Sequence, residues 1–149
     1  LGDEVEPAVE SMLHRRPWIR EIVCIGYSHG AAMAVLACED MTFLYGKRLE
    51  VSGYGFGTPR VLWGPIPRAV KSRLSAFYAT VCVPDLVTTV PPKWLGFRDV
   101  GIRVEIGAEK GYAPVHAHYA QSYLDALDTQ IRENTAETVK TAVGVPDKS

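Results

Sequence analysis

The sequence has few cysteines and no strong excess of charge of either sign. Its three cysteines, Cys24, Cys38 and Cys82, make an odd number and all lie in apolar stretches. This indicates small buried side chains rather than a disulfide framework, and it weakly favours a cytoplasmic location. Lysine and arginine together number 16 against 17 aspartates and glutamates. The composition therefore favours neither a nucleic-acid-binding protein nor a polybasic membrane surface.

Long apolar runs are also missing. The longest, Ala31–Cys38, is far shorter than the about 20 residues of a membrane-spanning helix. The first residues, LGDEVEPAVE, are acidic and do not resemble a signal peptide. A chain of 149 residues is long enough to bury a core, so we expect a single domain over residues 1–149. Its polar tail, 134–149, is expected to fray.

Helical and strand patterns alternate along the chain. Apolar residues at helical spacing predict a helix that ends before Pro17, a second from about His29, a short one after Pro67 and a last one over 119–131. Short apolar or alternating stretches predict strands at 22–25, 49–56, 77–83 and 100–106. Alternation of this kind favours an α/β fold, in which helices cover both faces of a mostly parallel sheet.

The stretch Gly26-Tyr27-Ser28-His29-Gly30 lies where a predicted strand turns into a predicted helix. The pattern G-x-S-x-G in this context is typical of a nucleophile elbow, which lifts a serine above the sheet. The two glycines are expected to let strand and helix meet closely. The backbone N–H of His29 would then be one donor of an oxyanion hole. The competing interpretation is that Ser28 only caps the helix.

A serine becomes a good nucleophile only beside a base that a carboxylate orients. His116 and His118 both lie between the last predicted strand and the last helix, where this class of fold places its base. Asp85 directly follows the strand at 77–83, so its carboxylate is expected at the same sheet edge as Ser28. The two histidines are also spaced as a metal pair, but no third ligand lies nearby, so no metal is expected.

Four stretches, in this order, resemble the class 3 lipases of the α/β-hydrolase superfamily: IVCIGYSHGAAMA, YGFGTPRV, VPDLVTTVPP and HYAQSYLDAL. The resemblance runs from the first helix through residue 127. It implies a cofactor-free hydrolase that cleaves carboxylic esters of lipids through an acyl-enzyme on Ser28. By this resemblance Asp85 is the acid and His118 is the base, with His116 as the second candidate.

The same resemblance implies that part of the fold is missing. The family has a long segment before the nucleophile strand, with further strands, a lid and the second oxyanion donor. Our hypothesis is that these residues are the C-terminal part of a longer hydrolase whose N-terminal strands are lost, cleaved or carried by a second chain. Otherwise the strand at 22–25 leaves an unpaired apolar edge.

Substrate and role remain open on the sequence. Trp63, Trp94, Leu95 and Phe97 lie in predicted loops, where they could contact a lipid surface transiently or pack in the core. One alternative is another serine acyl hydrolase, such as a thioesterase, cutinase or acyltransferase. A second is a non-catalytic, hydrolase-like binding module.

Overall fold

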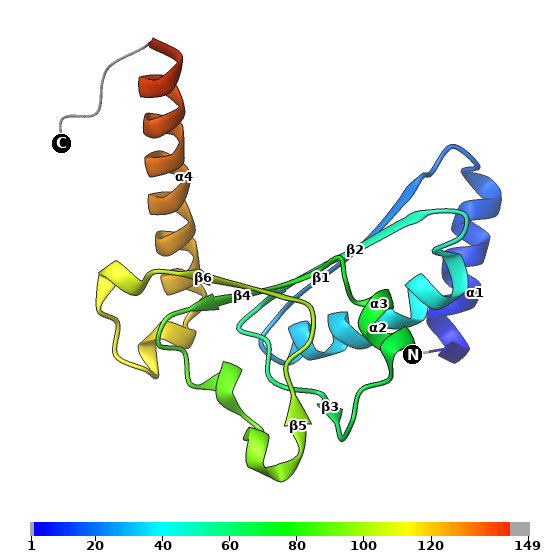
Figure 1. The fold of residues 1–149 in the computed structure, drawn as a ribbon. Helices are drawn as coiled ribbons and strands as arrows, with labels where there is room; N and C mark the ends of the chain where they lie inside the picture. The colour runs from blue at the N-terminus through cyan, green and yellow to red at the C-terminus, as the bar shows by residue number, and fades with distance from the viewer. Residues whose placement is uncertain (1, 144–149) are drawn as a thin grey trace.

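The computed structural model describes residues 2–143 (Figure 1). Four strands form the main sheet in the order β1-β2-β4-β6: β1 (Glu21–Tyr27), β2 (Glu50–Phe56), β4 (Phe77–Cys82) and β6 (Ile102–Ile106). All three pairings are parallel, as the sequence predicted. A small antiparallel pair, β3 (Leu62–Trp63) with β5 (Phe97–Arg98), was not predicted.

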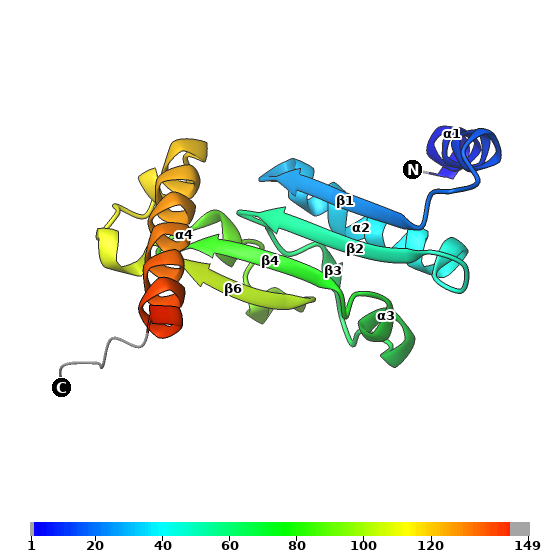
Figure 2. The same cartoon turned by 90° about the horizontal axis from the view of Figure 1, so that it is seen from above.

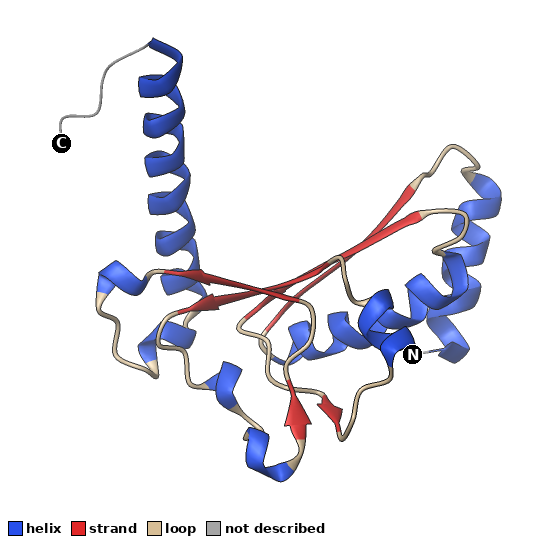
Figure 3. Cartoon of the chain, viewed as in Figure 1, coloured by secondary structure: helices blue, strands red, loops and turns tan. Residues whose placement is uncertain are grey.

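The α-helices are α1 (Gly2–Arg15), α2 (His29–Tyr45), α3 (Arg68–Arg73) and α4 (Ala120–Val143), coloured blue in Figure 3. Short 3₁₀ turns are η1 (Val87–Thr89), η2 (Lys93–Leu95), η3 (Ala108–Lys110) and η4 (His116–His118). The tail that the sequence predicts to fray from residue 134 is helical as far as Val143, because α4 contains no glycine or proline that would stop it. The rest of the predicted tail, 144–149, lies outside the described residues. Among the described residues, no helix combines the length and the apolar character needed to cross a bilayer.

One face of the sheet is packed against α2. Val35 and Cys38 of this helix are fully buried against Phe77 of β4 and Leu74. Gly53 of β2 makes this contact possible, because a Cβ there would lie 2.3 Å from the Phe77 ring. The sheet and α2 therefore share one close-packed apolar layer.

The opposite face is covered only at its carboxyl end. There α4 buries Tyr123 and Ala126 against Cys82 and Ile106. Figure 2 shows α4 across the ends of β4 and β6, with β1 and β2 uncovered on that side. The expectation of helices on both faces is thus only partly right, because α4 begins late and runs away from the sheet (Figure 1).

The uncovered part of the sheet carries apolar side chains. Ile25, Tyr54, Tyr78 and Ile102 are aligned partners on adjacent strands, and we call them the open row. Ile25 is 67% exposed, and Tyr54 and Ile102 are also exposed. Among the described residues β1 pairs with β2 alone, so it forms the edge of the sheet.

Candidate active site

The site is organised around the junction of β1 and α2. Ser28 joins them with φ 54° and ψ −122°, a backbone conformation that L residues rarely adopt. Two kinds of hydrogen bond hold this backbone: the Ser28 N–H donates to the Phe56 carbonyl at 2.8 Å, and the Ser28 carbonyl accepts from Ala31 and Ala32. The Ser28 side chain makes no capping hydrogen bond, so the helix-cap interpretation does not describe it.

The two motif glycines differ in what they allow. A Cβ on Gly26 would lie 2.1 Å from the Gly30 carbonyl oxygen, so only glycine lets β1 approach α2 there. A Cβ on Gly30 would meet nothing within 4 Å, because Gly30 is exposed. The prediction that both glycines make room is therefore right for Gly26 and wrong for Gly30.

A chain of hydrogen bonds leads from Ser28 to a buried carboxylate. Ser28 Oγ lies 2.8 Å from His118 Nε2, and His118 Nδ1 lies 2.8 Å from Asp85 Oδ2. His118 comes from η4, and Asp85 comes from the turn after β4. The Asp85 side chain is fully buried, and its Oδ1 accepts the Val87 N–H at 2.8 Å. The fold thus brings together the serine, the acid and the histidine that the sequence singled out.

The second histidine candidate lies apart from this chain of bonds. His116 packs its ring against Tyr119, with centroids 5.2 Å apart, and its carbonyl accepts the Ser122 hydroxyl. Within the described residues, no group of three or more His, Cys, Asp or Glu side chains could hold a metal ion.

The N–H of His29 directly follows Ser28 at the amino end of α2. His29 is the first residue of α2, so its N–H has no acceptor within the helix. Positive helix-dipole charge at this end also favours a developing anion.

Sequence reasoning missed two tyrosines at the site. Tyr123 of α4 donates its hydroxyl to Asp85 Oδ2 at 2.6 Å, the same oxygen that faces His118. Burial, together with the Asp85 carboxylate, raises the pKa of Tyr123, so this hydroxyl keeps its proton and remains a donor. Tyr27 stacks on the His118 ring, with centroids 5.4 Å apart, and donates its hydroxyl to the His118 carbonyl. Both tyrosines lie in stretches that resemble the class 3 lipases, Tyr27 in IVCIGYSHGAAMA and Tyr123 in HYAQSYLDAL, but their partners are seen only in the fold.

Gly57, at the end of β2, was also missed. It has φ +64°, and a Cβ there would lie 3.0 to 3.1 Å from His118 and Asp85. The only sequence signal was a glycine after a predicted strand. The backbone just after β2 therefore lies against the side chains of His118 and Asp85.

Comparisons with known proteins identify the family of this chain. A family model described as lipase (class 3) matches residues 1–94, more than half of the chain. This chain belongs to the class 3 lipase family. No curated protein matches it.

Solved lipase structures share its fold. It is 30% identical to lipase II from Rhizopus niveus, with TM-score 0.62, over 71% of this chain and 40% of that one. It is also 30% identical to the lipase from Rhizopus microsporus var. chinensis, with TM-score 0.60, over 73% of this chain and 38% of that one. The Rhizomucor miehei lipase propeptide complex, at 24% identity and TM-score 0.64, shows likeness of fold. This family member therefore spans about 40% of the length of the lipases it matches.

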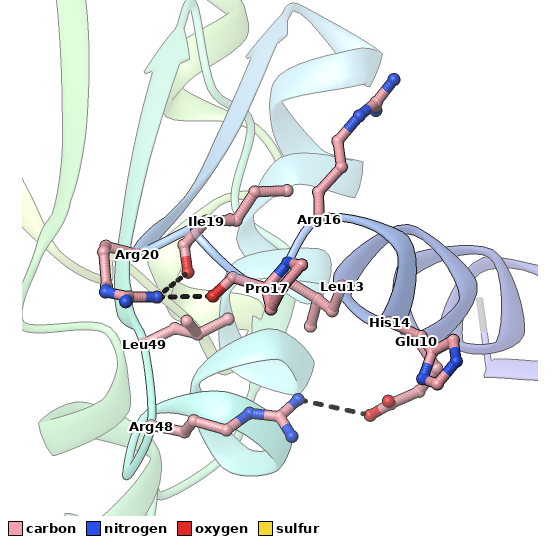
Figure 4. Close-up of a pocket in the computed structure, with 9 residues that line it drawn as sticks. All are labelled: Glu10, Leu13, His14, Arg16, Pro17, Ile19, Arg20, Arg48 and Leu49. Atoms are coloured by element: carbon pink, nitrogen blue, oxygen red, sulfur yellow. Dashed lines mark hydrogen bonds and ion pairs between the residues drawn. The ribbon is translucent and has the colours of Figure 1, made fainter.

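A pocket of about 320 Å³ lies at the amino end of the sheet of this lipase-family chain, away from Ser28 (Figure 4). Two of its basic side chains have partners within the protein. Arg20 donates to the carbonyls of Pro17 and Ile19, and Arg48 lies 3.6 Å from Glu10. Arg16 points away from the hollow (Figure 4). The pocket thus lies beside the contact that Leu13 of α1 makes with the cluster of Met41, Tyr45 and Leu49, at the end of the sheet opposite Ser28.

Proposed function

We propose that this chain carries the catalytic triad of a serine ester hydrolase that acts on carboxylic esters of lipids, of the acylglycerol type. The observation that supports this most is the unbroken path from Ser28 through His118 to Asp85, with both hydrogen bonds at 2.8 Å. Nucleophile, base and orienting acid are thereby within reach of one another. Membership of the class 3 lipase family supports the ester and lipid part of the proposal.

The proposed reaction is acyl transfer to water. Ser28 Oγ attacks the ester carbonyl carbon while His118 Nε2 takes the serine proton. The His29 N–H stabilises the oxyanion that forms. When the C–O bond breaks, His118 returns the proton to the leaving alcohol, and the acyl group stays on Ser28. Water, deprotonated by His118, then releases the acid.

Asp85 and its neighbours set the state of the base. The buried carboxylate holds the proton of the His118 ring on Nδ1, which leaves Nε2 free to accept. It also stabilises the imidazolium that forms during attack. The Val87 N–H and the Tyr123 hydroxyl keep this carboxylate in place.

We also propose that a further segment of polypeptide, or a second chain, completes the sheet beyond β1. Exposed apolar side chains in the open row and the free edge of β1 support this, because such an edge pairs readily with another strand. The lipases that the chain matches are more than twice as long as the matched part. The completing segment would be the source of a second oxyanion donor.

Labelling with a fluorophosphonate probe tests the proposal. We expect one equivalent of label on Ser28, located by peptide mass mapping, and none on Ser28→Ala. Hydrolysis of p-nitrophenyl acetate, butyrate and palmitate, beside the matching thioesters, then separates a lipase from a thioesterase or another acyl hydrolase. Folded protein without label on Ser28 would contradict an assembled triad and favour the non-catalytic binding module.

A further inference from the structure

A small cavity of about 50 Å³ lies between the sheet and the β3–β5 pair that hangs below it in Figure 1. It is on the α2 side of the sheet, because Ala79 and Val100, which line it, also pack against the cluster of Val35 and Cys38. A cavity needs only about 10 to 15 Å³ to hold one water, so this one has room for an ion with several oxygens. It is separate from the larger pocket at the amino end of the sheet, with which it shares no lining residue.

The walls of this cavity carry more positive than negative charge. Within the described part of the chain, three arginines and one carboxylate line it: Arg60, Arg98, Arg103 and Asp99. Two further charges pair with these residues, since Lys93 Nζ lies 2.5 Å from Asp99 Oδ2 and Glu105 Oε1 lies 2.7 Å from Arg103 Nε. Four cations therefore stand against two carboxylates, which leaves a formal excess of +2. Such an excess complements a ligand with two negative charges.

The charge of Asp99 is compensated, whereas that of Arg98 is not. Arg60 Nε lies 2.5 Å from Asp99 Oδ1, so each oxygen of this carboxylate has a cation beside it. Burial alone would raise the pKa of Asp99, but hydrogen bonds from Lys93 and Arg60 hold it below its usual value. Arg98 donates to the carbonyls of Lys93 and Phe97, and no carboxylate of the described residues pairs with it. Arg98 thus brings an uncompensated positive charge to the cavity.

Thr58 adds a buried polar atom to the same place. It lines the cavity, and its Oγ1 is buried without a hydrogen-bond partner among the described residues. The lack of a side chain on Gly55 gives this hydroxyl its space, because a Cβ there would lie 2.3 Å from Oγ1. A buried hydroxyl beside a cavity is ordinarily satisfied by a ligand or a water within it, and a hydroxyl can donate to an anion.

The cavity borders the segment that carries the acid of the candidate active site. Thr88, in the cavity wall, donates its hydroxyl to the Asp85 carbonyl at 2.9 Å. Arg60 donates to the carbonyls of Thr89 and Pro91 on the same segment. An anion bound to Arg60 would therefore stabilise the backbone that follows Asp85.

We propose that this cavity binds a tetrahedral oxyanion of the phosphate class, held by Arg98, Arg60 and the Thr58 hydroxyl. Arginine suits such an ion because its guanidinium is always charged and presents several N–H groups to the oxygens. A carboxylate fits less well, since it brings one negative charge where the cavity has an excess of +2. Binding at this site does not rest on the proposed ester hydrolase function.

Isothermal titration with inorganic phosphate, in chloride buffer of constant ionic strength, tests the proposal. The site variant is Thr58→Val with Arg98→Gln, which removes the unpartnered hydroxyl and the uncompensated charge and keeps Arg60. The matched control is Arg68→Gln, because Arg68 is an exposed arginine of α3 that does not line the cavity. Circular dichroism verifies that each variant is folded. If the double variant does not fold, Arg98→Gln alone replaces it.

We expect one phosphate per chain with a dissociation constant below about 1 mM. The double variant should bind at least about tenfold more weakly, Arg98→Gln alone at least about threefold more weakly, and Arg68→Gln within about twofold of the parent. Phosphate at ten times its dissociation constant should raise the melting temperature of the parent and of Arg68→Gln, and leave that of the site variant unchanged.

Equal weakening in Arg68→Gln and the site variant would overturn the proposal, because binding would then follow net charge alone. Absence of saturable binding below about 10 mM phosphate would overturn it as well. Glycerol 3-phosphate is the second probe: tighter binding than phosphate would assign the site to a phosphate ester, and equal or weaker binding to the free ion, and both results support the site. Labelling of Ser28 in phosphate-free buffer tests the hydrolase separately, so either proposal can fail while the other stands.

Discussion

Ser28 separates two unlike sides of the molecule. On the side of β2 and β4, the ends of the strands are close-packed: Gly57 lies under His118, and Asp85 accepts three hydrogen bonds of 2.6 to 2.8 Å. On the other side, β1 is an edge strand, a Cβ on Gly30 would meet open space, and Ile25 is exposed to solvent. The hydrogen-bonded chain from Ser28 through His118 to Asp85 therefore lies on the packed side, whereas the described residues leave the other side of the elbow open.

The largest expected effect lies on the packed side. His118→Ala should lower kcat/KM for p-nitrophenyl butyrate by at least about 10⁴-fold, because serine loses its base. His116→Ala should leave the rate within about twofold, since the His116 ring faces Tyr119. Equal losses in both variants would show that His116 also takes part, and the reverse order would assign the base to His116.

The next largest effect is expected from substituting the elbow glycines Gly26 and Gly30, which lie between the two sides. Gly26→Ala drives a Cβ into the Gly30 carbonyl, so we expect at least about a 100-fold loss of Ser28 labelling rate and a lower melting temperature. Gly30→Ala fills open space in the first turn of α2 and should raise the melting temperature slightly.

Labelling rates and melting curves of the two glycine variants, measured together, check this contrast. A damaging Gly30→Ala would mean that something outside the described residues packs against the elbow. That result would support a completing segment on the open side.

The sequence predicted the packed side better than the open side. G-x-S-x-G at a strand end and an aspartate after the third strand are local patterns, and parallel strands bring their carboxyl ends to one edge. Tyr27, Gly57 and Tyr123 escaped prediction because their roles depend on contacts with residues far along the chain. Likewise, an apolar strand such as 22–25 predicts a buried face, but no local pattern says what covers it.

A smaller effect is expected from substituting Tyr27, whose ring stacks on His118. Tyr27→Phe keeps the stacking on His118 but removes the hydrogen bond to its carbonyl, which should lower kcat/KM about threefold to tenfold. Tyr27→Leu removes both contacts and should cost more. Tyr54→Phe is the control, because Tyr54 stacks on Tyr78 in the open row, away from the histidine. A positioning role predicts a lower kcat with little change in KM, whereas equal losses in Tyr54→Phe would point to general destabilisation.

The smallest effect is expected on the open side, from substituting Ile25, and it is compared with a substitution of Val35 on the packed side. Ile25→Thr keeps a β-branched side chain in β1 and removes only exposed apolar surface, so the free energy of unfolding should change by at most about 0.5 kcal/mol. Val35→Thr, on the fully buried side of α2, should lose about 1 to 3 kcal/mol, because it buries a hydroxyl. Urea unfolding of both variants measures the difference. If Ile25→Thr is as damaging as Val35→Thr, or dissociates a complex that the parent forms, the open row is already covered by a partner in solution. If Ile25→Thr leaves the free energy of unfolding unchanged, the open row is uncovered in solution, and the apolar surface of Ile25 adds little to stability.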